Sequence, residues 1–312
     1  MVADAPYFAD LADGPAEVHV AWLTTRDGRR IRAAHWPLTG AKGTVILMPG
    51  RTEYIEKYGR AASDLARRGY ACASVDWRGQ GLADRSDADR MIGHIGDFDE
   101  FQRDVDALLA WARADGAEGP LFLIGHSMGG CIGLRSLARG LPFQAAAFSA
   151  PMWGISIAAW MRPLAPFIAQ LSVWAGRAQS YAPTTGGKTY LLSVPFEGNV
   201  LTSDPAMWDY MRCQVAGAPD LALGGPSMGW LHAALRECAA LSSLPSPTLP
   251  CITALGTAEK VVDPGPIHLR MTRWPQGKLD MYPMAEHEVM METPTHRARF
   301  FDTACGLFDA HR

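Results

Sequence analysis

The chain has 312 residues, of which 48% are hydrophobic and 20% are charged. Its 29 basic and 32 acidic residues give a formal net charge of −3. This near-neutral balance argues against a nucleic-acid partner, which would favour a basic face. The chain is also too apolar for intrinsic disorder and long enough to bury a core without cross-links. We therefore expect a globular protein that does not bind nucleic acid.

The first predicted elements are the two arms of a β-hairpin. Residues 17–23 and 30–36 alternate apolar and polar side chains, and Asp27-Gly28 between them is a strong turn signal. After the hairpin, apolar runs predict strands that are buried on both faces, with helices between them. The predicted strands are 44–48, 71–75, 121–124 and 145–150, and the predicted helices end at Arg68, Ala114 and Arg139.

Residues 140–176 resemble a membrane span in composition, because Arg162 is their only charged residue. About 20 consecutive apolar residues can cross a bilayer. Four prolines interrupt this run, however, and polar side chains dilute it. We predict a buried strand over 145–150 that is followed by short apolar helices.

The alternation of strands and helices stops at Pro151 and resumes near Pro250. The later predicted elements are a strand over 250–255, a helix over 264–274, a strand over 279–282 and a helix over 294–307. This order predicts an α/β fold with a mostly parallel central sheet flanked by helices. We expect residues 1–150 and 245–312 to form one core, and residues 151–244 to form a mainly helical cap inserted between two core strands.

The cysteines and the amino-terminal segment help to predict the cellular compartment of the protein. The six cysteines are scattered and form neither a C-x-x-C pair nor a His/Cys cluster with zinc spacing. Residues 1–17 are acidic and lack the basic and apolar regions of a secretory signal. We expect a cytoplasmic setting, free cysteines that pack as small core residues, and neither a metal nor a cofactor.

A tight turn after the strand 121–124 carries the main chemical motif. Gly125-His126-Ser127-Met128-Gly129 matches the G-x-S-x-G pattern of a nucleophile elbow, between a strand and a helix as that elbow requires. The glycines remove side chains that would clash in such a turn. The serine hydroxyl then lies at a helix N-terminus, which favours a developing anion. Ser127 is therefore the candidate nucleophile.

Ser127 needs a base that takes its proton and a carboxylate that orients this base. The histidine comes last in the chain order of such triads. His268 lies inside a predicted helix and His296 in the first turn of another. His287 instead lies in a loop after a strand, from which it can reach the serine, so we favour His287. We interpret His126 as a packed residue at the end of a strand.

Two carboxylates follow the strand 250–255 in the loop where the orienting acid belongs. Asp263 precedes Pro264 at the start of a predicted helix, so it has a structural explanation as an N-cap. Glu259 has no explanation beyond that of a solvated charge. We favour Glu259 as the triad acid and keep Asp263 as the alternative.

Acyl transfer also needs two N–H donors that stabilise the oxyanion of the tetrahedral intermediate. One is the backbone N–H of Met128, which follows the serine. The other comes from the loop after the strand 44–48, where we predict the backbone N–H of Arg51. Each such donor stabilises the transition state by roughly 3 kcal/mol.

In these motifs the chain resembles the α/β-hydrolase family, and within it the lysophospholipase and monoacylglycerol lipase branch. The resemblance runs from about Gly43 to the carboxyl end. Its motifs are P-G-R-x-E-x-x-x-K-Y at 49–58, D-W-R-G-Q-G at 76–81, G-H-S-M-G-G at 125–130, A-P-M at 150–152, N-x-L-T-S-D at 199–204 and G-G-P-x-x-x-W-L at 224–231. One residue departs from the pattern, because Pro49 stands where many relatives have histidine.

The resemblance implies a cap over the serine and hydrolysis of a single-acyl lipid ester, which is a small-molecule substrate. Carried over by position, the acid falls on Glu259 and the base on His287. Glu53 falls where the family contacts the polar head of the substrate or the cap. An apolar cap could also make peripheral contact with membrane lipid. The oligomeric state stays open.

Three hypotheses about function follow from these observations. The first is a serine ester hydrolase of the lysophospholipase or monoacylglycerol lipase type that works through an acyl-enzyme. The second is an esterase or peptidase acting on a small non-lipid substrate, and the third is a non-catalytic ligand-binding protein on the same fold. The complete Ser/acid/His set argues against the third. A preference for medium or long acyl chains would separate the first from the second.

Overall fold

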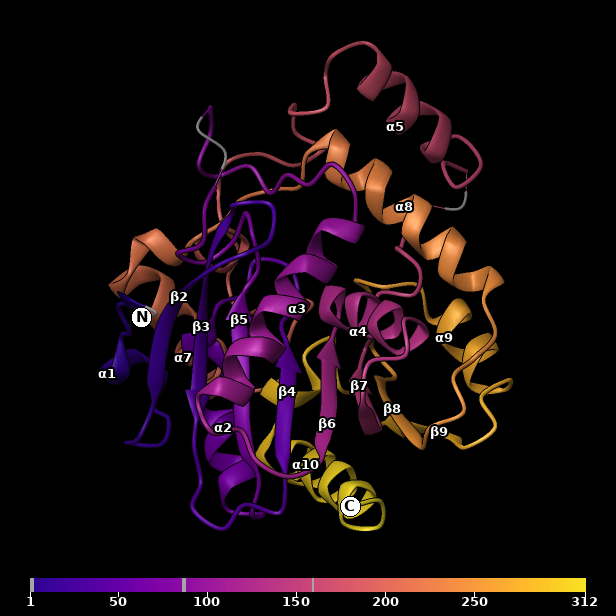
Figure 1. Cartoon of the computed structure of the whole chain (residues 1–312). Helices are drawn as coiled ribbons and strands as arrows, with labels where there is room; N and C mark the ends of the chain where they lie inside the picture. Colours follow the sequence, from indigo (N-terminus) through magenta and orange to yellow (C-terminus); the bar gives the residue numbers. More distant parts are fainter. Residues whose placement is uncertain (1–2, 86–87, 159) are drawn as a thin grey trace.

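The computed structural model describes residues 3–85, 88–158 and 160–312. In this part of the chain nine strands form one sheet in the order β1-β2-β3-β5-β4-β6-β7-β8-β9 (Figure 1). The strands are β1 (Ala3–Asp4), β2 (His19–Thr24), β3 (Arg30–Trp36), β4 (Thr44–Met48), β5 (Ala71–Asp76), β6 (Leu121–His126), β7 (Phe143–Ser149), β8 (Cys251–Gly256) and β9 (Gly277–Tyr282). From β5 to β9 neighbouring strands run parallel, and β1, β2 and β3 add an antiparallel edge. The predicted mostly parallel sheet is confirmed.

The predicted hairpin forms the antiparallel edge of this sheet. β2 pairs with β3 from His19–His35 to Thr24–Arg30. The turn between them needs a residue in the left-handed region, and Gly28 supplies it with φ of 82°. The short strand β1, which the sequence did not predict, pairs with β2.

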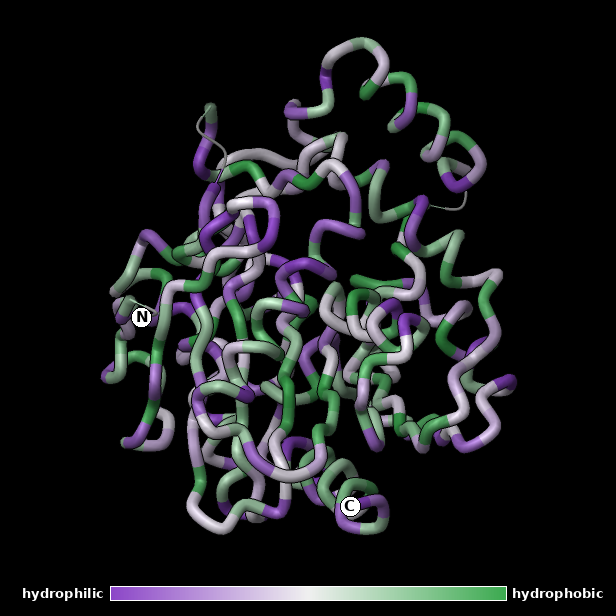
Figure 2. Tube along the Cα trace, in the orientation of Figure 1, coloured by the Kyte–Doolittle hydropathy of each residue, from purple (hydrophilic) through white to green (hydrophobic). Residues whose placement is uncertain are grey.

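The central strands are buried on both faces, as their continuous apolar runs predict. All residues of β4, β5 and β6 are buried. Alternate side chains of β4 enter two separate cores, since Ile46 and Met48 pack on one face and Val45 and Leu47 on the other. Figure 2 shows hydrophobic colours along these central strands.

Helices cover both faces of the sheet. The helices α3 (Asp99–Ala114), α4 (Met128–Ala138) and α9 (Pro264–Met271) contribute to one core, and α2 (Gly59–Ala66) and α10 (Pro294–Asp309) contribute to the other. The smaller elements are α1 (Ala9–Ala12), η1 (Ile55–Tyr58), η2 (Pro219–Leu221) and η3 (Val289–Met291). This layered arrangement is the predicted α/β architecture.

The segment between β7 and β8 is mainly helical, as expected for an insertion between two core strands. Its helices are α5 (Ala165–Trp174), α6 (Tyr190–Ser193), α7 (Pro205–Gly217) and α8 (Met228–Ser243). β7 and β8 are neighbours in the sheet, so the chain leaves the sheet and returns beside the same strand. The boundaries 151–244 of the cap stay a prediction.

The helices of this insertion lie on different sides of the molecule. α5 packs on α8 at the top of Figure 1, whereas α7 lies beside α1 and η1 near the amino end. Trp208 and Met211 of α7 are buried in the core that holds α2 and α10. α7 is therefore bound to the core, and α5 forms the outer part of the insertion.

The buried strand predicted over 145–150 is present as β7, and one short apolar helix, α5, follows it within residues 140–176 of the described chain. None of the helices in the described residues is both long and apolar enough to cross a membrane. All six cysteines lie in the described part as free thiols, and five are buried. The packing prediction is wrong for Cys213, because it lies on the outward face of α7 and is exposed.

Candidate active site

Ser127 occupies the sharp turn between β6 and α4. Its φ of 48° and ψ of −118° lie outside the regions that residues with side chains normally adopt. The neighbouring glycines make this turn possible. A Cβ on Gly129 would lie 2.0 Å from the carbonyl oxygen of Met48, and one on Gly130 would lie 2.5 Å from Cβ of Pro151. The turn has the geometry of a nucleophile elbow, with Ser127 at the N-terminus of α4.

The loop after β8 places Glu259 beside His287. Nδ1 of His287 lies 2.7 Å from Oε2 of Glu259. The other carboxylate oxygen of Glu259 accepts hydrogen bonds from the backbone N–H groups of Val261 and Val262, at 2.6 and 3.0 Å. Burial alone would raise the pKa of Glu259, but the hydrogen bond and charge of His287 and these two N–H groups lower it below its ordinary value. Glu259 is thus held as a carboxylate that orients His287.

The other candidates for the acid and the base, Asp263, His268 and His296, have different surroundings. Asp263 caps α9 by accepting a hydrogen bond from Gly265 N at 3.0 Å, as its sequence context predicts. His268 is exposed on α9, and His296 lies 3.0 Å from the carbonyl oxygen of Pro283. The geometry therefore brings Glu259 to His287 and leaves Asp263 in a structural position.

Ser127 and His287 line the same cavity, which has a volume of about 590 Å³ and lies between the sheet and the insertion. The Ser127 hydroxyl has no hydrogen-bond partner among the described residues. Such catalytic hydrogen bonds are often long before substrate binds. The cavity is the place where an acyl group would meet both side chains.

The loop that carries Arg51 is fixed from the core side. Nε1 of Trp77 donates to the carbonyl oxygen of Pro49 at 2.8 Å. Gln80 donates to the carbonyl oxygen of Gly50 at 3.0 Å and accepts from Thr52 N at 3.2 Å. The D-W-R-G-Q-G motif therefore supports this loop directly, although Pro49 departs from the family pattern.

The two predicted oxyanion donors are available. The backbone N–H groups of Arg51 and Met128 donate to no acceptor within the described residues. Met128 is the first residue of α4, so its N–H points out of the helix N-terminus. An anion near Ser127 can therefore use N–H groups that are not already satisfied.

A cluster of buried charges lies below the cavity, and sequence analysis missed most of it. Nζ of Lys57 lies 2.7 Å from Glu53 Oε1 and 2.6 Å from Glu288 Oε1. Nε2 of His126 lies 3.4 Å from Glu288 and 3.5 Å from Glu53. The His126 ring is tilted against the His287 ring, with 4.9 Å between their centres. We call Glu53, Lys57, His126 and Glu288 the buried charge cluster.

The pKa values in this cluster follow from its opposite charges. Burial would lower the pKa of Lys57 and of His126, but the charges of Glu288 and Glu53 outweigh burial and raise both values. Burial would raise the pKa of Glu288, but the charges of Lys57 and His126 lower it well below its ordinary range. Opposite charges therefore stabilise the charged forms of Lys57, His126 and Glu288 against burial.

The carboxylate of Glu53 has different partners from those that the family resemblance implies. Its carboxylate accepts hydrogen bonds from Lys57 Nζ at 2.7 Å, from the Tyr58 hydroxyl and from the backbone N–H of Gly50. Glu53 borders the cavity, but it is almost fully buried, and its three hydrogen-bond donors lie within five positions of it in the chain. We therefore expect Glu53 to position the Pro49–Thr52 loop more than to hold a polar head group.

Two groups of side chains in the described residues have the spacing of metal ligands. In one, Glu53, His126 and Glu288 face each other, but the ammonium of Lys57 already lies between the two carboxylates. In the other, His19 and His35 both place Nδ1 at 2.8 Å from the same oxygen of Asp115, on the antiparallel edge of the sheet.

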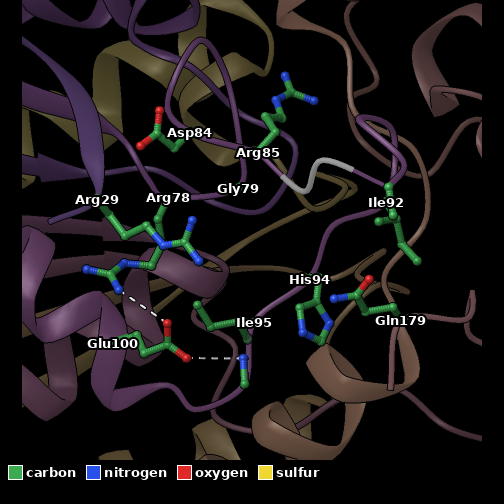
Figure 3. Close-up of a pocket in the computed structure, with 12 residues that line it drawn as sticks. Arg29, Arg78, Gly79, Asp84, Arg85, Ile92, His94, Ile95, Glu100 and Gln179 are labelled. Carbon is green, nitrogen blue, oxygen red and sulfur yellow. Dashed lines mark hydrogen bonds and ion pairs between the residues drawn. The ribbon is translucent and has the colours of Figure 1, made fainter. Parts of the chain in front are cut away.

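A second cavity, of about 460 Å³, is lined mainly by polar residues between Arg78 and Glu100 (Figure 3). Arg78 donates to Glu100 at 3.2 Å, and Glu100 accepts from Gly96 N at 3.2 Å. Of the described residues that line this cavity, none belongs to the Ser127–His287–Glu259 set. Arg85, which also lines it, donates only to backbone carbonyl oxygens of the described residues. The first cavity is the better candidate for catalysis, because it holds Ser127 and His287.

Comparison with known proteins identifies the family to which the chain belongs. The family model described as "Serine aminopeptidase, S33" matches residues 39–294. The chain belongs to this α/β-hydrolase family. Lysophospholipase L2 of Escherichia coli is 32% identical over 229 residues, which are 70% of this chain and 64% of that protein. The chain thus spans slightly less than two thirds of this relative.

Other relatives agree with this placement. A probable lysophospholipase L2 of Haemophilus influenzae is 26% identical over 82% of this chain and 80% of its own length. A crystal structure of a soluble variant of monoglyceride lipase from Saccharomyces cerevisiae matches with a TM-score of 0.73 and 22% identity, covering 99% of both chains. At that identity the structural match concerns the fold alone, and it confirms the fold class predicted from the sequence.

Proposed function

We propose that the chain is a serine ester hydrolase that cleaves a single-acyl lipid ester through an acyl-enzyme. The observation that carries the proposal is the 2.7 Å contact between His287 and Glu259 at the cavity that Ser127 enters from a strained turn. A serine becomes nucleophilic only beside an oriented base, and these three residues supply that arrangement. The names of the relatives, lysophospholipase and monoglyceride lipase, agree with it.

In this proposal each residue has one role. Oγ of Ser127 attacks the ester carbonyl carbon while Nε2 of His287 takes the hydroxyl proton. Glu259 holds the imidazole through Nδ1 and stabilises the imidazolium. The backbone N–H groups of Arg51 and Met128 stabilise the oxyanion, and His287 then protonates the leaving alcohol. Water enters, loses a proton to His287 and releases the fatty acid from Ser127.

The lining of the cavity favours an acyl chain as part of the substrate. Side chains from the core and from the insertion contribute apolar surface beside Ser127, namely Met152, Ile155, Leu201, Leu223, Val261 and Val262. Ligand sites of this kind combine apolar walls with a few polar groups that fix orientation. A volume of about 590 Å³ accommodates one acyl chain more readily than two.

Replacing Ser127 by alanine tests the proposal. We expect Ser127→Ala to abolish turnover of a short p-nitrophenyl ester, because the remaining groups cannot form the acyl-enzyme. The unfolding transition of the variant should match that of the parent chain, and a fluorophosphonate probe should label the parent but not the variant. Retained turnover in the variant would contradict the proposal, and failure of the probe to label Ser127 would favour a non-catalytic binding protein.

Acyl-chain length separates a lipid substrate from a small non-lipid ester or a peptide. We expect kcat/KM for p-nitrophenyl esters to rise from two carbons to medium or long chains. The family description names an aminopeptidase, but a peptide amine needs an unpaired carboxylate, and Glu53 and Glu288 both hold Lys57. A flat chain-length profile together with cleavage of aminoacyl anilides would favour the peptidase alternative.

We also propose that α5 makes peripheral contact with a lipid surface. Its exposed side chains are large and apolar, with Phe167 at 74% and Trp174 at 76% exposure. The helix contains no charged residue, and it forms the outermost part of the insertion (Figures 1 and 2). Contiguous exposed apolar surface of this kind marks interaction sites, and tryptophan suits the membrane interface. Cosedimentation of the chain with phosphatidylethanolamine/phosphatidylglycerol vesicles tests this contact.

A further inference from the structure

The side chain of Arg51 ends in the cavity without an acidic partner. Its Nη2 donates to the carbonyl oxygen of Gly224 at 2.7 Å, and its guanidinium carbon lies 5.5 Å from the centre of the Trp230 ring. Nε is buried and has no hydrogen-bond partner, and no carboxylate of the described residues pairs with the group. Burial lowers the pKa of Arg51 to about 9, so the side chain stays charged at neutral pH without a counter-ion.

The absence of a side chain at Gly93 leaves space for the guanidinium of Arg51. A Cβ on Gly93 would lie 2.4 Å from Nη2 of Arg51, so a side chain there would displace the guanidinium from this position. Backbone hydrogen bonds hold Gly93 in place against the insertion, from Gly93 N to the carbonyl oxygen of Gly225 at 3.1 Å and from Ser227 N to that of Gly93 at 2.9 Å. The position of Arg51 is therefore defined by two segments and is not that of a mobile surface side chain.

Other buried arginines of the described chain are satisfied within the protein. Arg32 pairs with Glu56 and Asp76 at 2.7 and 2.8 Å. Arg78 pairs with Asp104 at 2.7 Å and also reaches Glu100 in the second cavity (Figure 3). Arg51 differs from both, because it lines the cavity that holds Ser127 and pairs with no carboxylate of the described residues.

The charged residues that line the cavity of Ser127 favour the binding of an anion. Its two acidic residues, Glu53 and Glu288, both pair with Lys57, and Nε2 of His126 lies within 3.5 Å of each of them. The remaining cations are Arg51 and Lys188, which is exposed at the rim. An anion that enters the cavity therefore meets unpaired positive charge and no unpaired carboxylate among its lining residues.

We propose that the Arg51 guanidinium binds the phosphate of a lysophospholipid head group, so that the site takes phosphate-bearing single-acyl lipids in preference to monoacylglycerols. The inference rests on the proposed ester hydrolysis at Ser127. A guanidinium presents parallel N–H donors that match two phosphate oxygens. In a lysophospholipid the glycerol unit separates the ester carbonyl from the phosphate, and in Arg51 three methylene groups separate the proposed oxyanion donor from the guanidinium. Arg51 thus offers one group to each end of the polar half of the substrate: its backbone N–H to the ester carbonyl and its guanidinium to the phosphate.

The test compares two substrates with the same acyl chain, 1-lauroyl-glycerophosphoglycerol and 1-lauroylglycerol. The parent chain should show the higher kcat/KM for the phosphate-bearing lipid. Arg51→Met should lower the ratio of the two kcat/KM values by about tenfold to a hundredfold, because it removes charge-assisted hydrogen bonds to the phosphate. Arg51→Lys should restore part of the ratio, since it keeps the charge and loses the planar fork. The ratio cancels any disturbance of the oxyanion loop, which acts on both substrates.

Lys188→Met is the matched control, because it removes one positive charge from the exposed rim of the same cavity. We expect it to change the ratio by less than about threefold, since exposed charges interact weakly through water. Equal losses on both lipids in Arg51→Met, or no preference in the parent chain, would overturn the head-group inference and leave the ester hydrolase intact. Absence of turnover on any ester would overturn both.

Soluble anions show which source of phosphate the site recognises. We expect glycerol 3-phosphate to inhibit hydrolysis of p-nitrophenyl butyrate in the parent chain, with glycerol without effect and inorganic phosphate weaker. Inhibition by glycerol 3-phosphate should be lost in Arg51→Met and partly kept in Arg51→Lys, which retains the charge. Equal inhibition by inorganic phosphate would point to a free-anion site and would overturn the assignment to a lipid head group.

Discussion

The buried charge cluster beside the candidate active site and the outer face of α5 on the insertion differ in how their side chains meet water. Glu53, Lys57, His126 and Glu288 are charged or titratable side chains that are almost completely buried. On α5 the reverse holds, because Phe167, Leu171 and Trp174 are exposed. Both arrangements cost free energy in an isolated protein, since charges prefer water and large apolar side chains avoid it.

The difference between the two regions lies in what satisfies them. The buried charges pair with each other at distances of 2.6 to 3.5 Å, although Nε2 of His126 makes no hydrogen bond within the described residues. The face of α5 has no such partner among the described residues, and only its alanines pack inward against α8. The buried polar region is therefore expected to control chemistry and stability, and the exposed apolar region to control contact with lipid.

The largest expected effect is a loss of activity when Glu259 is replaced, because its buried carboxylate contacts His287. Glu259→Gln should lower kcat on a p-nitrophenyl ester by roughly 10³- to 10⁴-fold, because a neutral amide neither fixes the His287 tautomer nor stabilises the imidazolium. Asp263→Asn should change kcat by less than about threefold, and its stability by at most about 1 kcal/mol, since it only caps α9. If the two variants showed the opposite pattern, Asp263 would be the triad acid.

Removing the central cation of the buried charge cluster should destabilise the fold. Lys57→Met leaves Glu53 and Glu288 buried without their shared partner, which should lower the free energy of unfolding by about 3–5 kcal/mol. Urea denaturation measures this loss. Lys260→Met is the control, because Lys260 forms an exposed pair with Glu286 at 3.2 Å and should cost less than about 1 kcal/mol. Equal effects would mean that the cluster contributes no special stability.

The apolar side of the comparison is tested by making α5 polar. Phe167→Ser with Trp174→Ser should weaken binding to phosphatidylethanolamine/phosphatidylglycerol vesicles by roughly thirtyfold, if each aromatic side chain contributes about 1 kcal/mol at the interface. The free energy of unfolding should change by no more than about 0.5 kcal/mol, because both side chains are exposed.

The matched control removes exposed apolar side chains outside the insertion. Leu269 on α9 and Met284 after β9 are 52% and 77% exposed. Leu269→Ser with Met284→Ser should leave vesicle binding unchanged. A similar loss in both double variants would mean that binding depends on overall surface hydrophobicity and not on α5.

The smallest effect is a change in how stability depends on pH. The pKa of Glu288 is lowered in the folded chain from an ordinary value near 4.5, so it stabilises the fold above that pH and loses this contribution as the pH falls below it. Glu288→Gln should therefore lose less stability than the parent chain between pH 5 and 3. The difference is at most about 1.4 kcal/mol per pH unit, and urea denaturation across this range measures it. Parallel pH profiles would contradict the lowered pKa.

Local sequence signals were sufficient for much of the fold and part of the candidate site. The hairpin at Asp27-Gly28, the apolar central strands and the elbow around Ser127 each depend on neighbouring residues, so their spacing is visible in the chain. The choice between Glu259 and Asp263 was also local, because Pro264 identifies Asp263 as a helix cap. The structure agrees with that reasoning about Asp263.

The features that sequence analysis missed join distant parts of the chain. Lys57 and Glu288 are 231 positions apart, and nothing in either local sequence indicates that they pair. The same holds for Arg51, whose guanidinium meets the carbonyl of Gly224 across 173 positions. Glu53 was assigned from the family pattern alone, and only the fold reveals that Lys57, Tyr58 and Gly50 occupy its carboxylate.

The sequence by itself determined which segments form the strands from β2 to β9, where the strained serine turn lies and that the insertion is apolar. It could not determine which apolar helix is covered, because α5 and α7 are both rich in large apolar residues. Tertiary packing decided that Trp208 of α7 is buried in the core and that Trp174 of α5 is exposed. The physical reason is that periodicity and turns act over a few residues, whereas burial and ion pairing depend on which distant surfaces meet.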